Sequence, residues 1–156
     1  ANPCRCGNLE DCTRGPQCSE DYLGRISAPL MDRFDLRIEV PSVAYSDLDL
    51  PESGENSAGI SARVSAARAV QDARFSEYGD VWVNADAEGD ILAKFATPDT
   101  AGRELLLKVA ERFGLSARGY HRVLRVARTI ADLDGSEHVL KSHVAEAVSF
   151  RIATKG

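Results

Sequence analysis

The chain of 156 residues has few of the features that mark several protein classes. Aromatic residues make up 6% of it and the formal net charge is −5. These values argue against an aromatic platform for stacking single strands and against a surface that is cationic throughout. No apolar run approaches the length of a membrane span, so we expect no membrane partner. With 44% hydrophobic and 28% charged residues, the composition is that of a globular protein.

Cysteine is absent from most of the chain, because all four cysteines lie between positions 4 and 18. A secreted domain held by disulfides usually spreads its cysteines, and this cluster has no histidine beside it to suggest a catalytic thiol. Four thiolates form a tetrahedral zinc site, so we expect Cys4, Cys6, Cys12 and Cys18 to bind zinc. The spacing is not the paired Cys-x2-Cys pattern, and a metal-free loop or two disulfides are the alternatives.

The pattern along the chain predicts a mainly α fold. Polar and apolar residues alternate over 35–40, which predicts one strand that Pro41 ends. Residues 41–59 are rich in proline, glycine and serine and carry four acids without a base, as a linker does. Helical spacing starts at Ser57. It predicts a bundle of four or five helices, over 57–75, 86–95, from Thr97-Pro98 to 113, 116–133 and onward from a cap at Ser142.

Arginines follow one face of the predicted helix 116–133. Arg118, Arg122 and Arg125 lie at positions i, i+4 and i+7 with Arg128 at the flank, and apolar residues occupy the opposite face. Such a stripe suits phosphate, because guanidinium is planar, always charged and a bidentate donor. The alternative is a solvated face that pairs with nearby acids. The chain contains no Gly-x4-Gly-Lys-Ser/Thr phosphate loop and no complete active site.

Four blocks of residues, in the same order, resemble the YifB/ComM family of magnesium-chelatase-like AAA+ ATPases. The first is Asn2-Pro3-Cys4-x-Cys6-Gly7, and the second covers residues 26–36 and contains Arg33. The third joins Arg63-Val64 with Ala67-Arg68 and Gln71, and the most specific covers residues 115–133. The resemblance spans essentially the whole chain.

The resemblance implies that the chain is the end of an AAA+ α/β core, with one strand and a cysteine loop, followed by a helical lid. We therefore expect residues 1–41 to end the core, 42–58 to form an acidic linker and 59–156 to form the lid. The phosphate loop would lie upstream, so the isolated chain should hydrolyse no ATP. A cytoplasmic location is expected.

The resemblance also implies roles for single residues. Asn2 would be the polar sensor that orients the attacking water, and Arg33 the arginine finger that reaches the ATP of a neighbouring subunit. Arg118 would touch the γ-phosphate in its own subunit, and Arg125 is a weaker candidate for the same task. ATP and Mg²⁺ would be the cofactors of the full protein, beside zinc in the cysteine loop.

Three functions follow from these expectations. The first is a hexameric ATPase that remodels DNA, like the helicases of this family that drive branch migration during natural transformation. The second is the motor subunit of a magnesium chelatase, against which the cysteine loop argues. The third is a non-enzymatic module that joins a zinc loop to a helical bundle.

Overall fold

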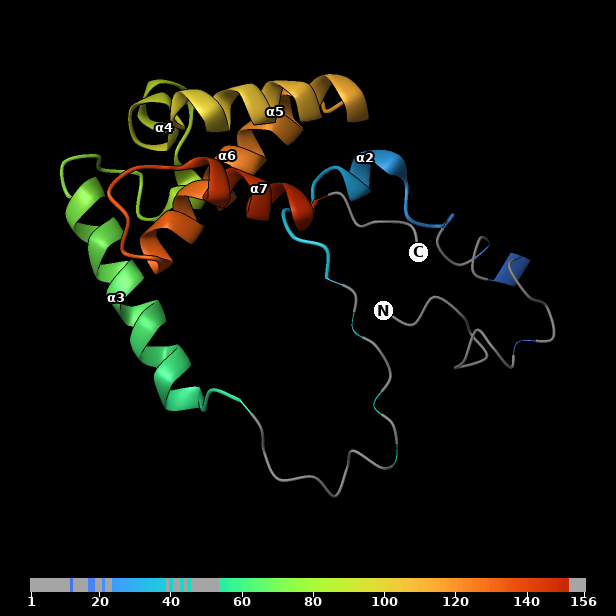
Figure 1. Ribbon diagram of the computed structural model, residues 1–156, viewed down its shortest axis with the longest axis horizontal. Helices are drawn as coiled ribbons and strands as arrows, with labels where there is room; N and C mark the ends of the chain where they lie inside the picture. The colour runs from blue at the N-terminus through green and yellow to red at the C-terminus, as the bar shows by residue number, and fades with distance from the viewer. Residues whose placement is uncertain are drawn as a thin grey trace. The chain divides into compact units, whose positions relative to one another are not determined.

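The computed structural model describes residues 12, 17–18, 21, 24–38, 40, 43, 45 and 54–151. It divides the chain into two compact units, Ala1–Phe34 and Asp35–Gly156. The prediction of a mainly α fold is confirmed, because the structure is mostly helical (Figure 1). None of the helices in the described ranges is long and apolar enough to cross a membrane.

The described part of the first unit centres on α2, a single helical turn at Ala28–Met31. The carbonyl of Ser27 accepts hydrogen bonds from the N–H groups of Leu30 and Met31, at 2.9 and 3.0 Å. The chain then continues in a tighter turn, in which the Arg33 N–H donates to the Leu30 carbonyl at 2.9 Å. Arg33 is thus placed at the end of a short helix with an exposed side chain.

The second unit is a helical bundle built around one central helix. Its elements are α3 (Ser57–Phe75), the 3-10 turn η2 (Asn84–Asp86), α4 (Gly89–Ala96), α5 (Thr100–Phe113), α6 (Ala117–Leu133) and α7 (Lys141–Ser149). Helix α6 contacts α3, α4, η2 and α7, while α5 packs on α7. Figure 1 shows α3 running along one side of the bundle, with its N-terminal half extending away from the other helices.

The core of this unit follows from the sequence of α6. Val123, Ala127 and Ala131 recur at four-residue spacing and are at most 2% exposed, so they form one apolar face along the helix. Small alanines on this face let neighbouring helices approach closely. The side chains that fill the space between the helices are Phe75, Leu92, Leu106, Leu124, Val139 and Val144.

The predicted bounds of the two longest helices are confirmed. Helix α3 begins at Ser57 and ends at Phe75, and α6 begins after the Ser116 cap and ends at Leu133. The predicted stop at Gly114 is confirmed as well, because Gly114 has a left-handed φ of 60° after the last turn of α5. Glycine adopts this conformation without strain, which is why it ends helices so often.

The predicted start of α5 at Thr97-Pro98 is wrong. Thr97 instead closes α4, donating its hydroxyl hydrogen to the Ala93 carbonyl at 2.5 Å. Pro98 forms a parallel bridge with Val139, and Asp99 caps α5 by accepting a hydrogen bond from the Gly102 N–H at 2.7 Å. The start of the helix predicted over 86–95 is also wrong. Residues 84–86 form η2, and α4 begins at Gly89.

The sequence predicts that Ser142 caps the last helix, and this prediction is wrong. Helix α7 starts at Lys141 after Leu140, and Ser142 lies exposed inside its first turn. The imidazole of His143 replaces the expected cap: its Nδ1 accepts the Leu140 N–H at 3.0 Å. Because Nδ1 accepts, Nε2 carries the hydrogen and lies 3.2 Å from Asp134 Oδ2.

The strand predicted at 35–40 is also wrong for the residues of this segment that the structure describes. None of residues 35–38 and 40 belongs to a strand, and Ile38 and Val40 are 68% and 83% exposed. A strand needs a neighbour to which its backbone can bond. This segment is instead held to the bundle by the Arg37 N–H, which donates to the Phe150 carbonyl at 2.8 Å.

Candidate functional site

Arg118 lies in the first turn of α6, where a sharp helix–helix connection brings it to the surface. Gly114 ends α5, and the Ser116 hydroxyl then accepts a hydrogen bond from the Gly119 N–H at 3.0 Å, which fixes the start of α6. The side chain of Arg118 is exposed and makes no ion pair or hydrogen bond with the residues that the structure describes. The partial positive charge of a helix N-terminus adds to its own charge.

The other arginines of the predicted stripe are engaged within the bundle. Arg122 Nη1 lies 2.5 Å from Asp35 Oδ1, and Arg125 donates to the Ala87 carbonyl at 2.9 Å and to Glu88 at 3.0 Å. Arg128, expected at the flank of an exposed face, is only 3% exposed. The alternative interpretation, a face that pairs with acids, therefore agrees with the contacts of Arg122 and Arg125, while Arg118 pairs with no acid within the described part of the chain. A nucleotide-binding role for Arg125 stays a prediction.

The predicted catalytic and metal-binding residues are only partly within the described ranges. Asn2, Cys4 and Cys6 lie outside them, while Arg33 is exposed, Cys12 is partly buried and Cys18 is buried. No group of three or more metal-binding side chains is found among the described residues. Since two of the four cysteines are outside that search, zinc binding stays a prediction.

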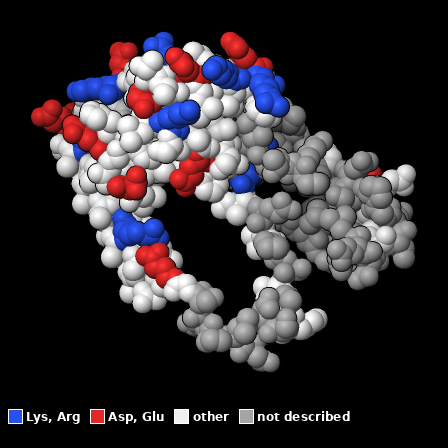
Figure 2. Space-filling view, in the orientation of Figure 1, with Lys and Arg blue, Asp and Glu red and all other residues white. Residues whose placement is uncertain are grey.

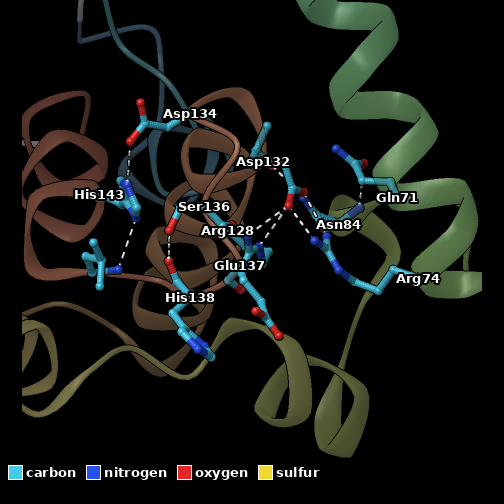
Figure 3. A network of polar contacts seen from close by, with 12 residues as sticks. Gln71, Arg74, Asn84, Arg128, Asp132, Asp134, Ser136, Glu137, His138 and His143 are labelled. Atoms are coloured by element: carbon cyan, nitrogen blue, oxygen red, sulfur yellow. Dashed lines mark hydrogen bonds and ion pairs between the residues drawn. The ribbon is translucent and has the colours of Figure 1, made fainter.

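A buried polar network at the C-terminal end of α6 was not predicted from the sequence (Figure 3). Its centre is the carboxylate of Asp132, whose side chain is fully buried. Arg74 of α3 donates from Nη1 to Asp132 Oδ2 at 2.8 Å and from Nη2 to Oδ1. Asn84 of η2 donates to the same carboxylate at 2.7 Å, and Arg128 does so from Nε at 3.1 Å.

The network joins separate parts of the bundle through backbone groups as well. Gln71 accepts a hydrogen bond from the Asn84 N–H at 3.2 Å, which ties α3 to η2. Arg128 donates to the carbonyls of Ser136 and Glu137, at 2.6 and 2.8 Å, and so holds the loop between α6 and α7. The one local signal in the sequence is the i, i+4 spacing of Arg128 and Asp132.

Charge and burial act in opposite directions on the groups of this network. Burial by itself would raise the pKa of Asp132, but hydrogen bonds from Arg74 and Asn84, together with the positive charges of Arg128 and Arg74, hold this pKa below its usual range. Burial lowers the pKa of Arg128; Asp132 counteracts this shift and the like charge of Arg74 adds to it. Two guanidinium groups share one carboxylate, so the network keeps a net positive charge.

Charges of both signs are mixed on one face of the described bundle. On the face that Figure 2 shows, lysines and arginines alternate with aspartates and glutamates. No single-sign patch of the kind that holds a nucleic acid along its whole length dominates this face.

Comparison with known proteins places the chain in a family. The family profile "Magnesium chelatase, subunit ChlI C-terminal" matches residues 54–151, and "Magnesium chelatase, subunit ChlI" matches residues 1–48. The chain belongs to the magnesium chelatase ChlI-subunit family. The two matches meet near the acidic segment predicted as a linker, while the predicted domain bounds themselves stay a prediction.

Curated relatives of this ChlI-family chain confirm the resemblance to the YifB/ComM proteins. It is 38% identical to Competence protein ComM of Haemophilus influenzae over 137 residues, which is 87% of this chain and 26% of that protein. It is 37% identical to YifB of Escherichia coli over 146 residues, 93% of this chain and 28% of that protein. Protein Rv2897c of Mycobacterium tuberculosis is 36% identical over 156 residues, 97% of this chain and 30% of that protein. The chain thus spans less than a third of the length of these relatives.

Proposed function

We propose that this chain contributes the helical lid and the arginine finger of an ATP-hydrolysing motor of the ChlI family. The observation that carries the proposal is the position of Arg118. It is the member of the arginine stripe that has no partner among the described residues, and it lies beside a helix N-terminus. A guanidinium in this setting suits the γ-phosphate of ATP, to which it can donate two hydrogen bonds.

In this proposal the chain acts at two nucleotides. Arg118 binds the γ-phosphate of ATP in its own subunit, and the exposed Arg33 reaches the ATP of the neighbouring subunit. There it neutralises charge that develops on the transferred phosphoryl group, while Asn2 orients the attacking water. Mg²⁺ would neutralise the phosphates of the same nucleotide. Because Arg33 acts in trans, the working assembly is a closed ring, and we propose a hexamer.

DNA is the proposed substrate of the ring, with chelation as the second candidate. The relative named Competence protein supports a role in DNA uptake, and the family profile named for magnesium chelatase supports the alternative. The cysteine loop favours the first, because the chelatase motor is not expected to carry one. Hydrolysis that DNA stimulates would support remodelling, whereas hydrolysis coupled to metal insertion into a porphyrin would support the alternative.

The four cysteines complete the proposal as thiolate ligands of one zinc ion. Cys18 is 8% exposed, and a buried sulfur suits a closed structural site. Metal analysis of the purified protein decides between zinc and a metal-free loop.

Substitution of Arg118 in the full-length protein tests the nucleotide role. We expect Arg118→Ala to lower kcat/KM for ATP by about tenfold or more, because a charge-assisted hydrogen bond to phosphate contributes roughly 1.5–3 kcal/mol. Arg68→Ala is the matched control, since Arg68 is an exposed arginine on α3 and should leave turnover unchanged. Equal activities of the two variants would contradict the assignment.

A further inference from the structure

A cleft of about 530 Å³ lies beside the buried polar network. It is bounded by the C-terminal parts of α3, α4 and α6 and by residues 135–139 of the loop before α7. Its volume lies in the range of pockets that hold small molecules. Arg118 does not line it, and Arg128, which does, is ten residues further along α6, about 15 Å away.

The cleft gathers more positive than negative charge. Arg74, Lys94 and Arg128 line it, against the carboxylates of Asp132 and Glu137, which leaves a formal charge of about +1. The side chain of Asp132 is fully buried, whereas that of Arg74 is 11% exposed, so the lining offers more guanidinium surface than carboxylate surface at this network.

Two of these cations lie close to one aromatic ring. The ring centre of Phe95 is 6.0 Å from the Arg74 guanidinium carbon and 5.0 Å from Lys94 Nζ. Lys94 also donates a hydrogen bond to the Tyr78 hydroxyl at 2.8 Å, and this bond raises the pKa of Lys94. Lys94 therefore remains charged at neutral pH, and it lies beside the apolar ring of Phe95.

The cations retain hydrogen-bond donors that their described partners do not use. Arg74 donates the two hydrogens of Nη1 to Asn84 and Asp132, and one hydrogen of Nη2 to Asp132. Its Nε–H and the second Nη2–H have no partner among the described residues, and neither do two of the three hydrogens on Lys94 Nζ. These donors are what an oxyanion requires.

We propose that this cleft binds a small molecule that carries one oxyanion, a phosphate or a carboxylate, next to an apolar body. The oxyanion bonds Lys94 and the unused hydrogens of Arg74, and the apolar body lies against the ring of Phe95. The site is separate from the proposed nucleotide contact at Arg118, so each can fail without the other.

Titration of the full chain with three probes tests this inference, with amide chemical shifts as the readout and ionic strength held constant. Inorganic phosphate presents the oxyanion alone, benzoate presents it on an apolar ring, and benzyl alcohol presents the ring without charge. We expect benzoate to bind saturably and more tightly than phosphate, with benzyl alcohol much weaker. If phosphate binds as tightly as benzoate, the ligand is a free oxyanion and the ring of Phe95 plays no part in binding. Equal binding of benzoate and benzyl alcohol, or no saturable binding of either anion, overturns the proposal.

Three exposed residues provide variants that should still fold. Lys94→Gln should weaken benzoate binding by about fivefold, the effect of removing one exposed charge partner. Glu137→Gln should tighten it, because it removes a negative charge from the lining of the cleft. Lys108→Gln, on α5 and outside the cleft, is the matched control and should change nothing. If the network has a purely structural role, benzoate should bind all three variants equally well. That result would refute an anion site here.

Discussion

At the scale of single residues, Asp132 concentrates more interactions than any residue of the proposed nucleotide contact. Its carboxylate is fully buried and accepts hydrogen bonds from Arg74, Asn84 and Arg128, which come from three different elements. A buried charge costs several kcal/mol in desolvation unless partners of opposite charge compensate for it. Here two arginines depend on one aspartate, so the loss of that aspartate leaves both uncompensated.

We therefore expect Asp132→Asn to destabilise the chain by about 3–5 kcal/mol. Asparagine keeps the shape of the side chain but leaves two buried guanidinium groups without a counter-charge. Denaturant unfolding measures the effect, and Asp80→Asn, which changes an exposed aspartate in a turn, serves as the control. A loss below about 1 kcal/mol would show that the network contributes little to stability.

The pH dependence of stability provides a second readout of the same substitution. Because the folded-state pKa of Asp132 lies below the ordinary value of 3.8, the unfolded chain takes up this proton more readily. The stabilisation is therefore complete above about pH 4 and is lost as the pH falls through the folded-state pKa. We expect the difference in unfolding free energy between wild type and Asp132→Asn to shrink over that acidic range, and a constant difference would argue against a charged Asp132.

At the scale of elements, local pattern was sufficient where one helix determines its own bounds. Ser116 and the apolar spacing in α6 predicted both ends of that helix, and α3 was predicted equally well. One error arose where a distant residue decides the local structure, because Val139 pairs with Pro98 in a bridge. The other arose locally, because the imidazole of His143, three residues after Leu140, takes the place of a serine cap at α7.

The candidate site shows the same division. The exposure of Arg118 follows from its place in the first turn of an amphipathic helix, which the sequence reveals. The partners of Arg122 and Arg125 are 87 and 37 residues away in the chain, so spacing along one helix could not identify them. Asn84 and Arg74 reach Asp132 across 48 and 58 residues, which is why the network was missed.

The two serine caps, one real and one only predicted, allow a matched test. Ser116→Ala should destabilise the chain by about 1 kcal/mol, because it removes the acceptor of the Gly119 N–H. Ser142→Ala should be neutral or slightly stabilising, because Ser142 is exposed inside α7 and alanine favours the helix. Thermal or denaturant unfolding of both variants checks the pair, and equal losses would contradict the cap assignment.

At the scale of the whole molecule, the chain presents the two proposed phosphate-binding arginines on separate units. Arg33 belongs to the unit Ala1–Phe34 and Arg118 to the unit Asp35–Gly156. A finger and a lid that serve different nucleotides do not need to meet within one subunit. This division therefore agrees with the proposed ring, in which each subunit completes the site of its neighbour.

Arg33→Ala in the full-length protein should therefore abolish ATP hydrolysis and leave ATP binding nearly intact. An arginine finger contributes about a thousandfold or more to kcat by neutralising transition-state charge, whereas it adds little to the binding of the ground state. Arg25→Ala is the matched control, because Arg25 is an exposed arginine in the same unit and should keep full turnover. Arg33→Lys should not restore activity, since lysine lacks the planar pair of donors.

Mixed rings separate a finger that acts in trans from one that acts within its own subunit. A subunit with Arg33→Ala and an intact nucleotide site should hydrolyse ATP when a wild-type neighbour supplies the arginine. Subunits that carry Arg118→Ala lack a contact to their own nucleotide, so no neighbour should repair them. Adding an excess of Arg33→Ala subunits with a second substitution that blocks their own ATP binding should silence wild-type sites next to them. If wild-type subunits keep full turnover in those rings, Arg33 does not act on the neighbouring nucleotide.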